Sequence, residues 1–351
     1  MNSKEALAKA WSKLKEEEPK LRIKNAADKL GVTEVELLAT QQDITRLNED
    51  WPGIFQAVES LGYVMALTRN ESVVHERRGE YHNISFNKHV GLVLDPNIDL
   101  RIFPARLGSA FAVPVPTPRG VLQSIQFFDT FGIAAHKIYL LKEENLGQFN
   151  DLVESFKNED QDAELVIEKG EAPSAYDYKN SIDKDAFIKD WSSLKDTHDF
   201  YPLLKKYNVK RTDALALAEG VFTQKVENTI TESMLHGAAE LEVPIMVFVG
   251  SRAVIQIHSG PVKTIKKMDN WLNVLDPEFN LHLQEDHIVD SWIVRKPTED
   301  GIVTSIEVYD KDGRDIATFF GARKPGIPEL ESWRNLVKEL ETKEAKMETI
   351  K

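Results

Sequence analysis

The segment Val93-Leu94-Asp95-Pro96 recurs as Val274-Leu275-Asp276-Pro277, an offset of 274 − 93 = 181 residues. The same offset relates a longer set of identical residues: Gly79 and Gly260, Leu100 and Leu281, Pro116-Thr117 and Pro297-Thr298, Gly120 and Gly301, Ser124-Ile125 and Ser305-Ile306, Asp129 and Asp310, Gly132 and Gly313. Turn formers and apolar core residues dominate this set, which indicates a duplicated scaffold. Polar residues differ at equivalent places, such as Arg101 against His282 and His75 against Gln256. We therefore expect function where the copies diverge.

Length and composition favour a soluble globular protein of two domains. The chain has 351 residues, of which 42% are hydrophobic and 29% charged. No apolar run approaches the roughly 20 residues that cross a bilayer, and the N-terminus lacks a signal-peptide pattern. The chain has no cysteine, which excludes disulfides, iron–sulfur clusters and thiolate zinc sites and favours a reducing cytoplasm.

The net charge of −13 disfavours binding of nucleic acid through its phosphates. A small anionic ligand stays possible where a local cluster of Lys and Arg receives it. The distribution of basic residues therefore matters more than their sum.

Each half is predicted to run from helices through strands to a helix. Helical spacing predicts helices over 6–14, 26–30, 35–40, 188–194, 201–207 and 214–221, and closing helices over 146–156 and 329–340. Thr33 with Glu36 resembles a capping box. Residues 63–75 and 243–258 are rich in Val, Ile and Phe and alternate as strands do, and Asp310-Lys311-Asp312-Gly313 predicts a hairpin turn.

This order predicts an α+β fold of two tandem, similar repeats, each with an antiparallel sheet flanked by helices. We expect an N-terminal repeat over 1–156 and a C-terminal repeat over 186–345. Residues 157–185 are dense in Asp, Glu and Lys apart from Leu165-Val166-Ile167, which predicts a solvated acidic linker.

Blocks of the second half resemble a known family. They are Val243-Pro244-Ile245-Met246-Val247-Phe248-Val249-Gly250, Ile255-Gln256-Ile257-His258-Ser259-Gly260-Pro261-Val262, Trp271-Leu272-Asn273-Val274-Leu275-Asp276-Pro277 and Phe279-Asn280-Leu281-His282-Leu283. With the length and the duplication, they resemble the bacterial cytoplasmic hemin-transport and hemin-degrading factors of the HemS/HmuS/ChuS type. The resemblance implies a large antiparallel sheet in each half and cytoplasmic handling of heme after import.

A heme needs an axial ligand for its iron and cations for its two propionates, and without cysteine the ligand is His, Tyr or Met, or a water held by Arg. His198 precedes Phe200-Tyr201-Pro202, where a helix is predicted to begin. From the residues alone, a surface or capping histidine is the more common reading. The resemblance implies that His198 is the proximal iron ligand.

Arg101 lies among apolar residues in Asp99-Leu100-Arg101-Ile102-Phe103. An outward-facing arginine in an ion pair is the ordinary reading. The resemblance implies a distal catalytic role, in which the charged, planar guanidinium holds a water or hydroxide on the iron. An aromatic residue is expected a few residues on, but Arg106-Leu107-Gly108 stands there, which indicates an altered distal wall.

For the propionates, the resemblance implies Arg211, Lys296 and Arg323, although each alone could be an ordinary solvated cation. Phe319 is expected to give apolar contact to heme, with the reservation that Phe319 or Phe320 belongs to the core. His75 is a candidate ligand for a second heme in the N-terminal half, and an exposed strand histidine is an equally good reading of it.

Three functions agree with these residues. The first is an enzyme that opens the heme ring and releases iron, with electrons from an external reductase, since no dinucleotide-binding glycine fingerprint appears. The second is a carrier that takes heme from an importer to a separate oxygenase. The third is a duplicated module for another planar or acidic ligand without a metal. No nucleophile elbow or His-Glu-x-x-His motif supports a hydrolase or a metal-dependent enzyme.

Overall fold

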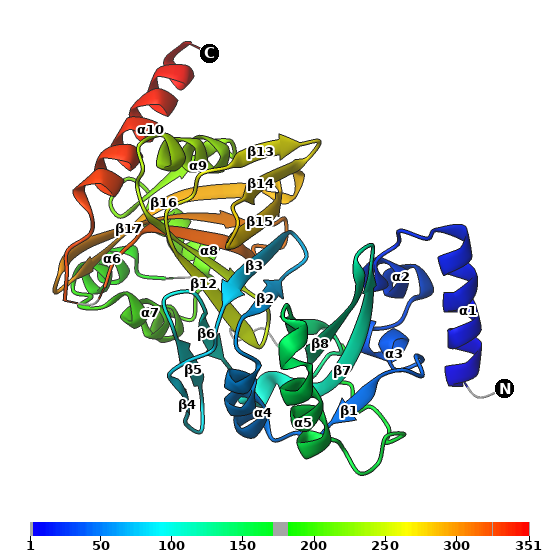
Figure 1. Cartoon of the computed structure of the whole chain (residues 1–351). Helices are drawn as coiled ribbons and strands as arrows, with labels where there is room; N and C mark the ends of the chain where they lie inside the picture. Colours follow the sequence, from blue (N-terminus) through cyan, green and yellow to red (C-terminus); the bar gives the residue numbers. More distant parts are fainter. Residues whose placement is uncertain (1–2, 171–181, 325, 351) are drawn as a thin grey trace. The chain divides into compact units, whose positions relative to one another are not determined.

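A computed structural model describes residues 3–170, 182–324 and 326–350, and these residues form two compact units (Figure 1). Unit 1 comprises Met1–Arg69, Glu76–Gly170 and Ser251–Gln256, and unit 2 comprises Asn70–His75, Glu171–Gly250 and Ile257–Lys351. Each unit therefore includes a short segment from the opposite half of the sequence.

Unit 1 consists of helices on both faces of an antiparallel sheet. Its helices are α1 (Ser3–Glu17), α2 (Ile23–Leu30), α3 (Glu34–Leu38), α4 (Trp51–Val58), η1 (Glu59–Leu61), η2 (Pro104–Arg106), η3 (Glu143–Asn145) and α5 (Leu146–Phe156). Its strands are β1 (Thr45–Leu47), β2 (Val64–Arg69), β4 (Ile84–Phe86), β5 (Gly91–Leu94), β6 (Asp99–Ile102), β7 (Leu107–Thr117), β8 (Gly120–Asp129) and β9 (Ala134–Leu140). Pairing gives the order β1-β7-β8-β9-β2, and separately β6-β5-β4.

Unit 2 repeats this plan. Its helices are α6 (Lys184–Ser192), η4 (Thr197–Asp199), α7 (Phe200–Tyr207), α8 (Arg211–Leu217), α9 (Ile230–Glu240), η5 (Glu285–His287) and α10 (Glu331–Ile350). Its strands are β10 (Thr223–Val226), β11 (Ile245–Gly250), β13 (Ile265–Met268), β14 (Trp271–Leu275), β15 (Phe279–Gln284), β16 (Asp290–Thr298), β17 (Gly301–Tyr309) and β18 (Asp315–Gly321). The order is β10-β16-β17-β18-β11, and separately β15-β14-β13. Strands β3 (Val73–Gly79) and β12 (Val254–Gly260) contain residues of both units.

Helices cover opposite faces of the five-stranded part in each unit. In unit 2, α9 and α10 pack over one face, and this core contains Ile306 and Phe319. Helices α6, α7 and α8 cover part of the other face, where the core contains Trp292, Val294 and Tyr309. In unit 1, α4 and α5 cover one face and α3 the other, with α1 and α2 packed on α3.

The duplicated residues build the same turns twice. Thr117 Oγ1 donates to the Gly120 carbonyl at 2.7 Å, and Thr298 Oγ1 donates to the Gly301 carbonyl at the same distance. Both glycines have positive φ, 125° and 108°, which explains why glycine is kept there. The repeated sequence pattern therefore corresponds to a repeated backbone.

The predicted α+β fold with two similar halves is confirmed, as are the capping box at Thr33 and the hairpin between β17 and β18. Helices α4 and α9 were not predicted. The domain limits 1–156 and 186–345 stay a prediction. Of the predicted linker 157–185, residues 171–181 lie outside the described part, while Leu165 and Ile167 pack against the apolar core beside α3.

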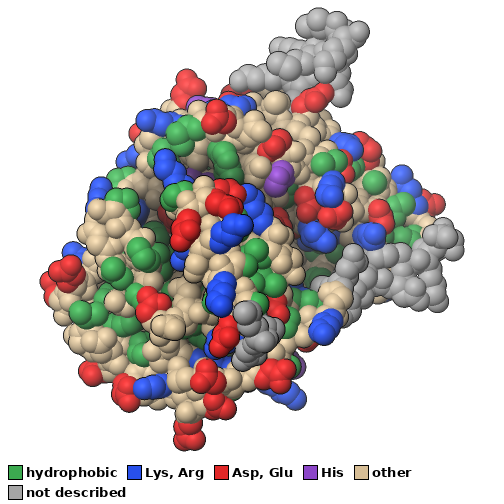
Figure 2. Space-filling model, turned by 90° about the vertical axis from the view of Figure 1, so that its right-hand side faces the viewer, with side chains coloured by type: hydrophobic (Ala, Val, Ile, Leu, Met, Phe, Trp, Pro, Cys, Tyr) green, Lys and Arg blue, Asp and Glu red, His purple; other side chains and the backbone are tan. Residues whose placement is uncertain are grey.

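Figure 2 shows acidic and basic side chains interspersed over the described part of one face. None of the helices within the described ranges is both long and apolar enough to cross a membrane.

Candidate functional site

His198 is presented at the surface of unit 2 by a short, capped helix. It lies in η4, directly before α7, and its side chain is 92% exposed. The Asp196 carboxylate accepts a hydrogen bond from the His198 backbone N at 2.8 Å, and Asp199 accepts from the Asp196 backbone N at 3.1 Å. This reciprocal cap stabilises the local backbone. The predicted break before the helix is thus a 3₁₀ turn.

The Asp196 carboxylate also holds the imidazole ring. Its Oδ1 lies 2.5 Å from His198 Nδ1. The hydrogen bond donated by the His198 backbone N is the largest cause of a lowered pKa of Asp196. Burial raises this pKa, but the hydrogen bond from the His198 ring lowers it further, and the net shift is downward. An ionised carboxylate only accepts hydrogen bonds, so Nδ1 of the neutral imidazole carries the proton and Nε2 keeps its lone pair. The pair therefore offers one exposed nitrogen for a metal.

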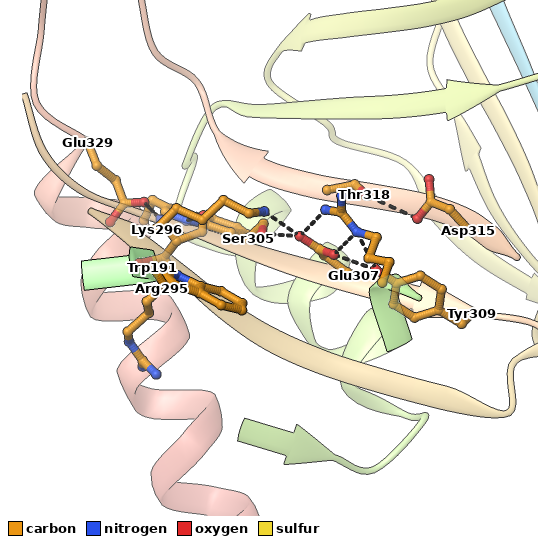
Figure 3. Close-up of polar contacts among 12 residues, drawn as sticks. Trp191, Arg295, Lys296, Ser305, Glu307, Tyr309, Asp315, Thr318 and Glu329 are labelled. Carbon is orange, nitrogen blue, oxygen red and sulfur yellow. Dashed lines mark hydrogen bonds and ion pairs between the residues drawn. The ribbon is translucent and has the colours of Figure 1, made fainter. Parts of the chain in front are cut away.

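A buried charged network, the Glu307 network, lies on the sheet face that α6 to α8 partly cover (Figure 3). The Glu307 side chain is fully buried. Its Oε1 accepts from Lys296 Nζ at 2.8 Å, from Arg211 Nη2 at 2.7 Å and from Ser305 Oγ at 2.9 Å. Its Oε2 accepts from Arg211 Nε at 2.8 Å and from the Tyr309 hydroxyl. Two cations thus share one carboxylate.

Burial and the two cations act in opposite directions on the titration of the Glu307 network. Burial raises the pKa of Glu307, but Arg211 and Lys296 outweigh it, so the net shift is downward and the carboxylate stays ionised. Burial lowers the pKa of Lys296, which Glu307 counteracts in part. A second carboxylate, Asp315 on β18, acts on the same groups, and burial raises its pKa to about 6, so above this pH two acids face the two cations. The Arg211 side chain is 33% exposed, so its guanidinium is accessible from solvent.

Phe200 connects the network to His198. It is the first residue of α7 and is buried, and Trp191 lies edge-on to its ring at 4.5 Å. Arg211 and Lys296 lie 5.1 Å and 4.9 Å from the centre of the same ring. Cation–π contacts of this kind fix the start of α7 against the network. His198 is two residues away in sequence, so its loop is anchored there.

Arg323 has hydrogen-bond donors to spare. Its side chain is 16% exposed, and its ion pair with Asp300 is long, with 3.6 Å between Nη2 and Oδ2. Its Nε is buried and has no hydrogen-bond partner within the described residues. The charge of Arg323 also contributes, as the smallest cause, to the lowered pKa of Asp196. Arg323 therefore acts electrostatically on the His198 loop and has a donor without a partner within the described residues.

Phe319 lies on the opposite face of the sheet from Glu307. It pairs with Ile306 and Val247 and is fully buried in the core under α9 and α10. The half-buried Phe320 instead pairs with Ser305, on the face of the network, and lies 5.2 Å from the Phe248 ring. The structure thus brings Phe320, and not Phe319, to the face that carries Arg211 and Lys296.

Arg101 and His75 are placed separately. Arg101 belongs to unit 1, on β6, and its guanidinium donates to the Asp99 carboxylate, while its side chain is 32% exposed. His75 is fully buried in unit 2, with its ring 5.0 Å from Phe279. Phe279 in turn stacks flat on His258 at 3.8 Å. His75 is therefore part of a packed aromatic cluster.

Asp196, Ser305, Glu307 and Tyr309 were not predicted from the sequence. The alternation of β17 places Ser305, Glu307 and Tyr309 on one face, and the β16–β17 hairpin adds Lys296 to it. The pairing of β16 with β17 could therefore have been used to predict that Lys296, Ser305, Glu307 and Tyr309 share one face. Asp196 could have been found as a helix cap two residues before His198.

The chain belongs to the family of the haemin-degrading HemS.ChuX domain, whose model matches residues 31–156 and 208–340. It is 35% identical over 342 residues to the hemin transport protein HmuS of Yersinia pestis, covering 97% of this chain and 98% of HmuS. This result confirms the resemblance inferred from the sequence.

Solved structures agree. The fold matches PhuS, a heme-binding protein from Pseudomonas aeruginosa, in its holo form with a TM-score of 0.92 and 45% identity, over 96% of this chain and 99% of PhuS. It matches ChuS, an Escherichia coli heme oxygenase, with a TM-score of 0.85 and 34% identity, over 95% of this chain and 99% of ChuS.

The Glu307 network gives a prediction for stability. Replacing Glu307 by Gln removes the ion-pair partner of the buried Lys296 and of the partly exposed Arg211, which should destabilise the protein by about 3–5 kcal/mol. Because the folded pKa of Glu307 is lowered, its contribution is complete above the ordinary value of 4.5 and is lost as the pH falls below it. Denaturant unfolding of wild type and Glu307→Gln should therefore differ most near neutrality and converge in acid. Glu299→Gln, at an exposed ion pair with Lys195, is the control and should change little. Equal losses in both variants would contradict the role of Glu307.

Proposed function

We propose that the chain binds heme in unit 2, with His198 as the axial ligand of the iron. The observation that carries this proposal is the exposed imidazole whose Nδ1 is held by Asp196, so that Nε2 is free to bind a metal. Metal-bound histidines commonly have such a carboxylate partner, because it fixes the ring and its tautomer. A porphyrin already supplies four nitrogens, so one imidazole is sufficient as the protein ligand.

The cations of unit 2 fit the two propionates. Arg211 and Arg323 are partly exposed and can donate to carboxylates directly, as arginine does well. Lys296 is almost fully buried, so we assign it a charge effect through the Glu307 network instead of direct contact. For the apolar plate we assign Phe320 in place of Phe319, because Phe319 is enclosed on the opposite face.

We propose further that the bound heme is degraded by ring opening with release of iron. Heme supplies an iron that reacts with dioxygen, and the electrons come from an external donor. Arg101 keeps the distal hydrogen-bonding role that the resemblance implies. A second heme at His75 requires that its buried ring become exposed. The E. coli relative named a heme oxygenase supports this activity.

A carrier function is the alternative, and the almost complete exposure of His198 favours it, because an exposed ligand is easily handed over. The names of the relatives HmuS and PhuS refer to hemin transport and heme binding. In both versions, we propose a cytoplasmic protein that receives heme from an importer, and in the enzymatic version an external reductase as partner.

Loss of the imidazole should abolish specific heme binding. In an absorbance titration with hemin, His198→Ala should lose more than the about 10–100-fold in affinity that loss of a hydrogen-bond partner of a metal-bound histidine costs, and its Soret band should shift. His236→Ala, at an exposed position of α9, is the matched control and should titrate like wild type. Unchanged affinity and spectrum in His198→Ala would reject the assignment.

Ring opening separates the enzyme from the carrier. The purified heme complex is mixed with ascorbate in air, with catalase present to remove free peroxide, and iron release is followed with a ferrous chelator. An enzyme should lose its Soret band while iron appears in proportion, and the anaerobic sample should stay unchanged. A stable Soret band in air would contradict ring opening and favour the carrier function.

Asp196 should tune the bound iron through His198. Asp196→Asn keeps an oxygen that can cap η4 but removes the negative partner of the ring, so heme affinity should fall by about 10–100-fold and the reduction potential should rise. Asp199→Asn alters the same cap without touching the ring and should keep the wild-type potential. If the two variants behave alike, the contact between Asp196 and the ring has no role of its own. The assignment of His198 as iron ligand is tested separately, by the titration of His198→Ala.

A further inference from the structure

Unit 1 contains a cavity of about 480 Å³ that is separate from the residues discussed above. Its walls come from the first turn of α1, the turn after α3, strands β1 and β7, and the segment after α5. The lining residues are Lys4, Glu5, Ala8, Ala39, Thr40, Gln41, Gln42, Ile44, Arg46, Phe111, Gln161, Asp162, Ala163 and Leu165. Cavities of about 300–1,000 Å³ are typical of small-molecule sites.

Arg46 is a buried cation at this cavity. The residue is 8% exposed, and its guanidinium donates one hydrogen bond, from Nη1 to the Ala163 carbonyl. No carboxylate within the described residues forms an ion pair with it. Two other buried cations form ion pairs with carboxylates: Lys137 Nζ lies 2.9 Å from Glu34 Oε1, and Lys296 Nζ lies 2.8 Å from Glu307 Oε1. Arg46 is therefore a buried charge that has no ion-pair partner among residues 3–170, 182–324 and 326–350.

The backbone around Arg46 is firmly held. Gln161 Oε1 accepts from the Arg46 backbone N at 2.8 Å, and Gln161 Nε2 donates to the Arg46 carbonyl at 3.0 Å. Arg46 also faces Phe111 across the β1–β7 pair. A buried cation normally has an anionic partner, because an isolated charge costs several kcal/mol to desolvate. The fixed position of Arg46 suits a ligand that supplies the anion.

We propose that this cavity binds a small organic monocarboxylate, with its carboxylate on Arg46 and its apolar part against Phe111, Ile44 and Leu165. The planar guanidinium can donate two parallel hydrogen bonds to a carboxylate. Glu5 and Asp162 also line the cavity, and their negative charges disfavour a phosphate dianion. Of the two lining cations, Lys4 pairs through Nζ with the Asp162 carboxylate at 3.4 Å, so Arg46 is the one without a carboxylate partner within the described residues.

Sodium benzoate is a suitable probe, because it combines one carboxylate with a flat apolar ring. Calorimetric titration of the full, heme-free chain should show saturable binding, and phenyl phosphate should bind more weakly. Arg46→Gln should weaken benzoate binding by about tenfold or more, as the loss of a charge-assisted hydrogen bond predicts. Lys9→Gln, which removes one exposed charge from α1 outside the cavity, is the matched control and should bind like wild type.

A second variant protects the test against misfolding. Ala8→Phe places a ring in the cavity and leaves Arg46 intact, so it should abolish benzoate binding while heme binding at His198 is kept. Absence of benzoate binding to wild type, or equal binding to Ala8→Phe and wild type, would overturn the proposal. Tighter binding of phenyl phosphate than of benzoate would overturn the choice of a carboxylate.

Discussion

The carboxylate of Glu307 holds two cations, the buried Lys296 and the partly exposed Arg211, and the geometry of unit 2 around His198 depends on it. Arg211 begins α8, Lys296 lies on β16, and Glu307 lies on β17 between them in space. Removing the carboxylate would leave the buried Lys296 without an ion-pair partner, and removing the cations would leave a buried carboxylate. Both cations contact the ring of Phe200, the first residue of α7, so this network positions the start of α7 and the His198 loop before it.

The first copy contains a network of the same kind, also with one acid and two bases, but different elements supply them. Glu34 is the first residue of α3, as Arg211 is the first residue of α8. Glu34 is buried and pairs with Lys137 on β9 and with Arg69 on β2. Burial raises the pKa of Glu34, but these two cations outweigh it. In unit 1 the helix thus supplies the acid and the strands the bases.

The residues equivalent to the second network, at the offset of 181, are uncharged in the first copy. Gln126 corresponds to Glu307, Phe128 to Tyr309 and Val115 to Lys296. Gln126 bonds Ser124, as Glu307 bonds Ser305, so the scaffold contact survives while the charge does not. This is physical support for seeking function where the copies diverge, and it distinguishes the heme site proposed in unit 2 from the carboxylate site proposed in unit 1.

Sequence patterns within short segments were sufficient to predict the fold, but they did not predict contacts between residues that are far apart in the sequence. Turn residues, strand alternation and the His198 break could be predicted because each depends on neighbours in sequence. Helix α9 was not predicted, and its Gly237 lies where α9 packs against α10: a Cβ there would lie 2.6 Å from Leu336 Cδ1, and that side chain would have to shift. The contact of Arg211 with Glu307 spans 96 residues and the charge balance at Arg46 depends on its whole surroundings. A net charge of −13 therefore says little about anion binding, because individual sites differ from the sum: Arg46 is buried and has no carboxylate partner within the described residues, and Glu307 is one carboxylate shared by Arg211 and Lys296.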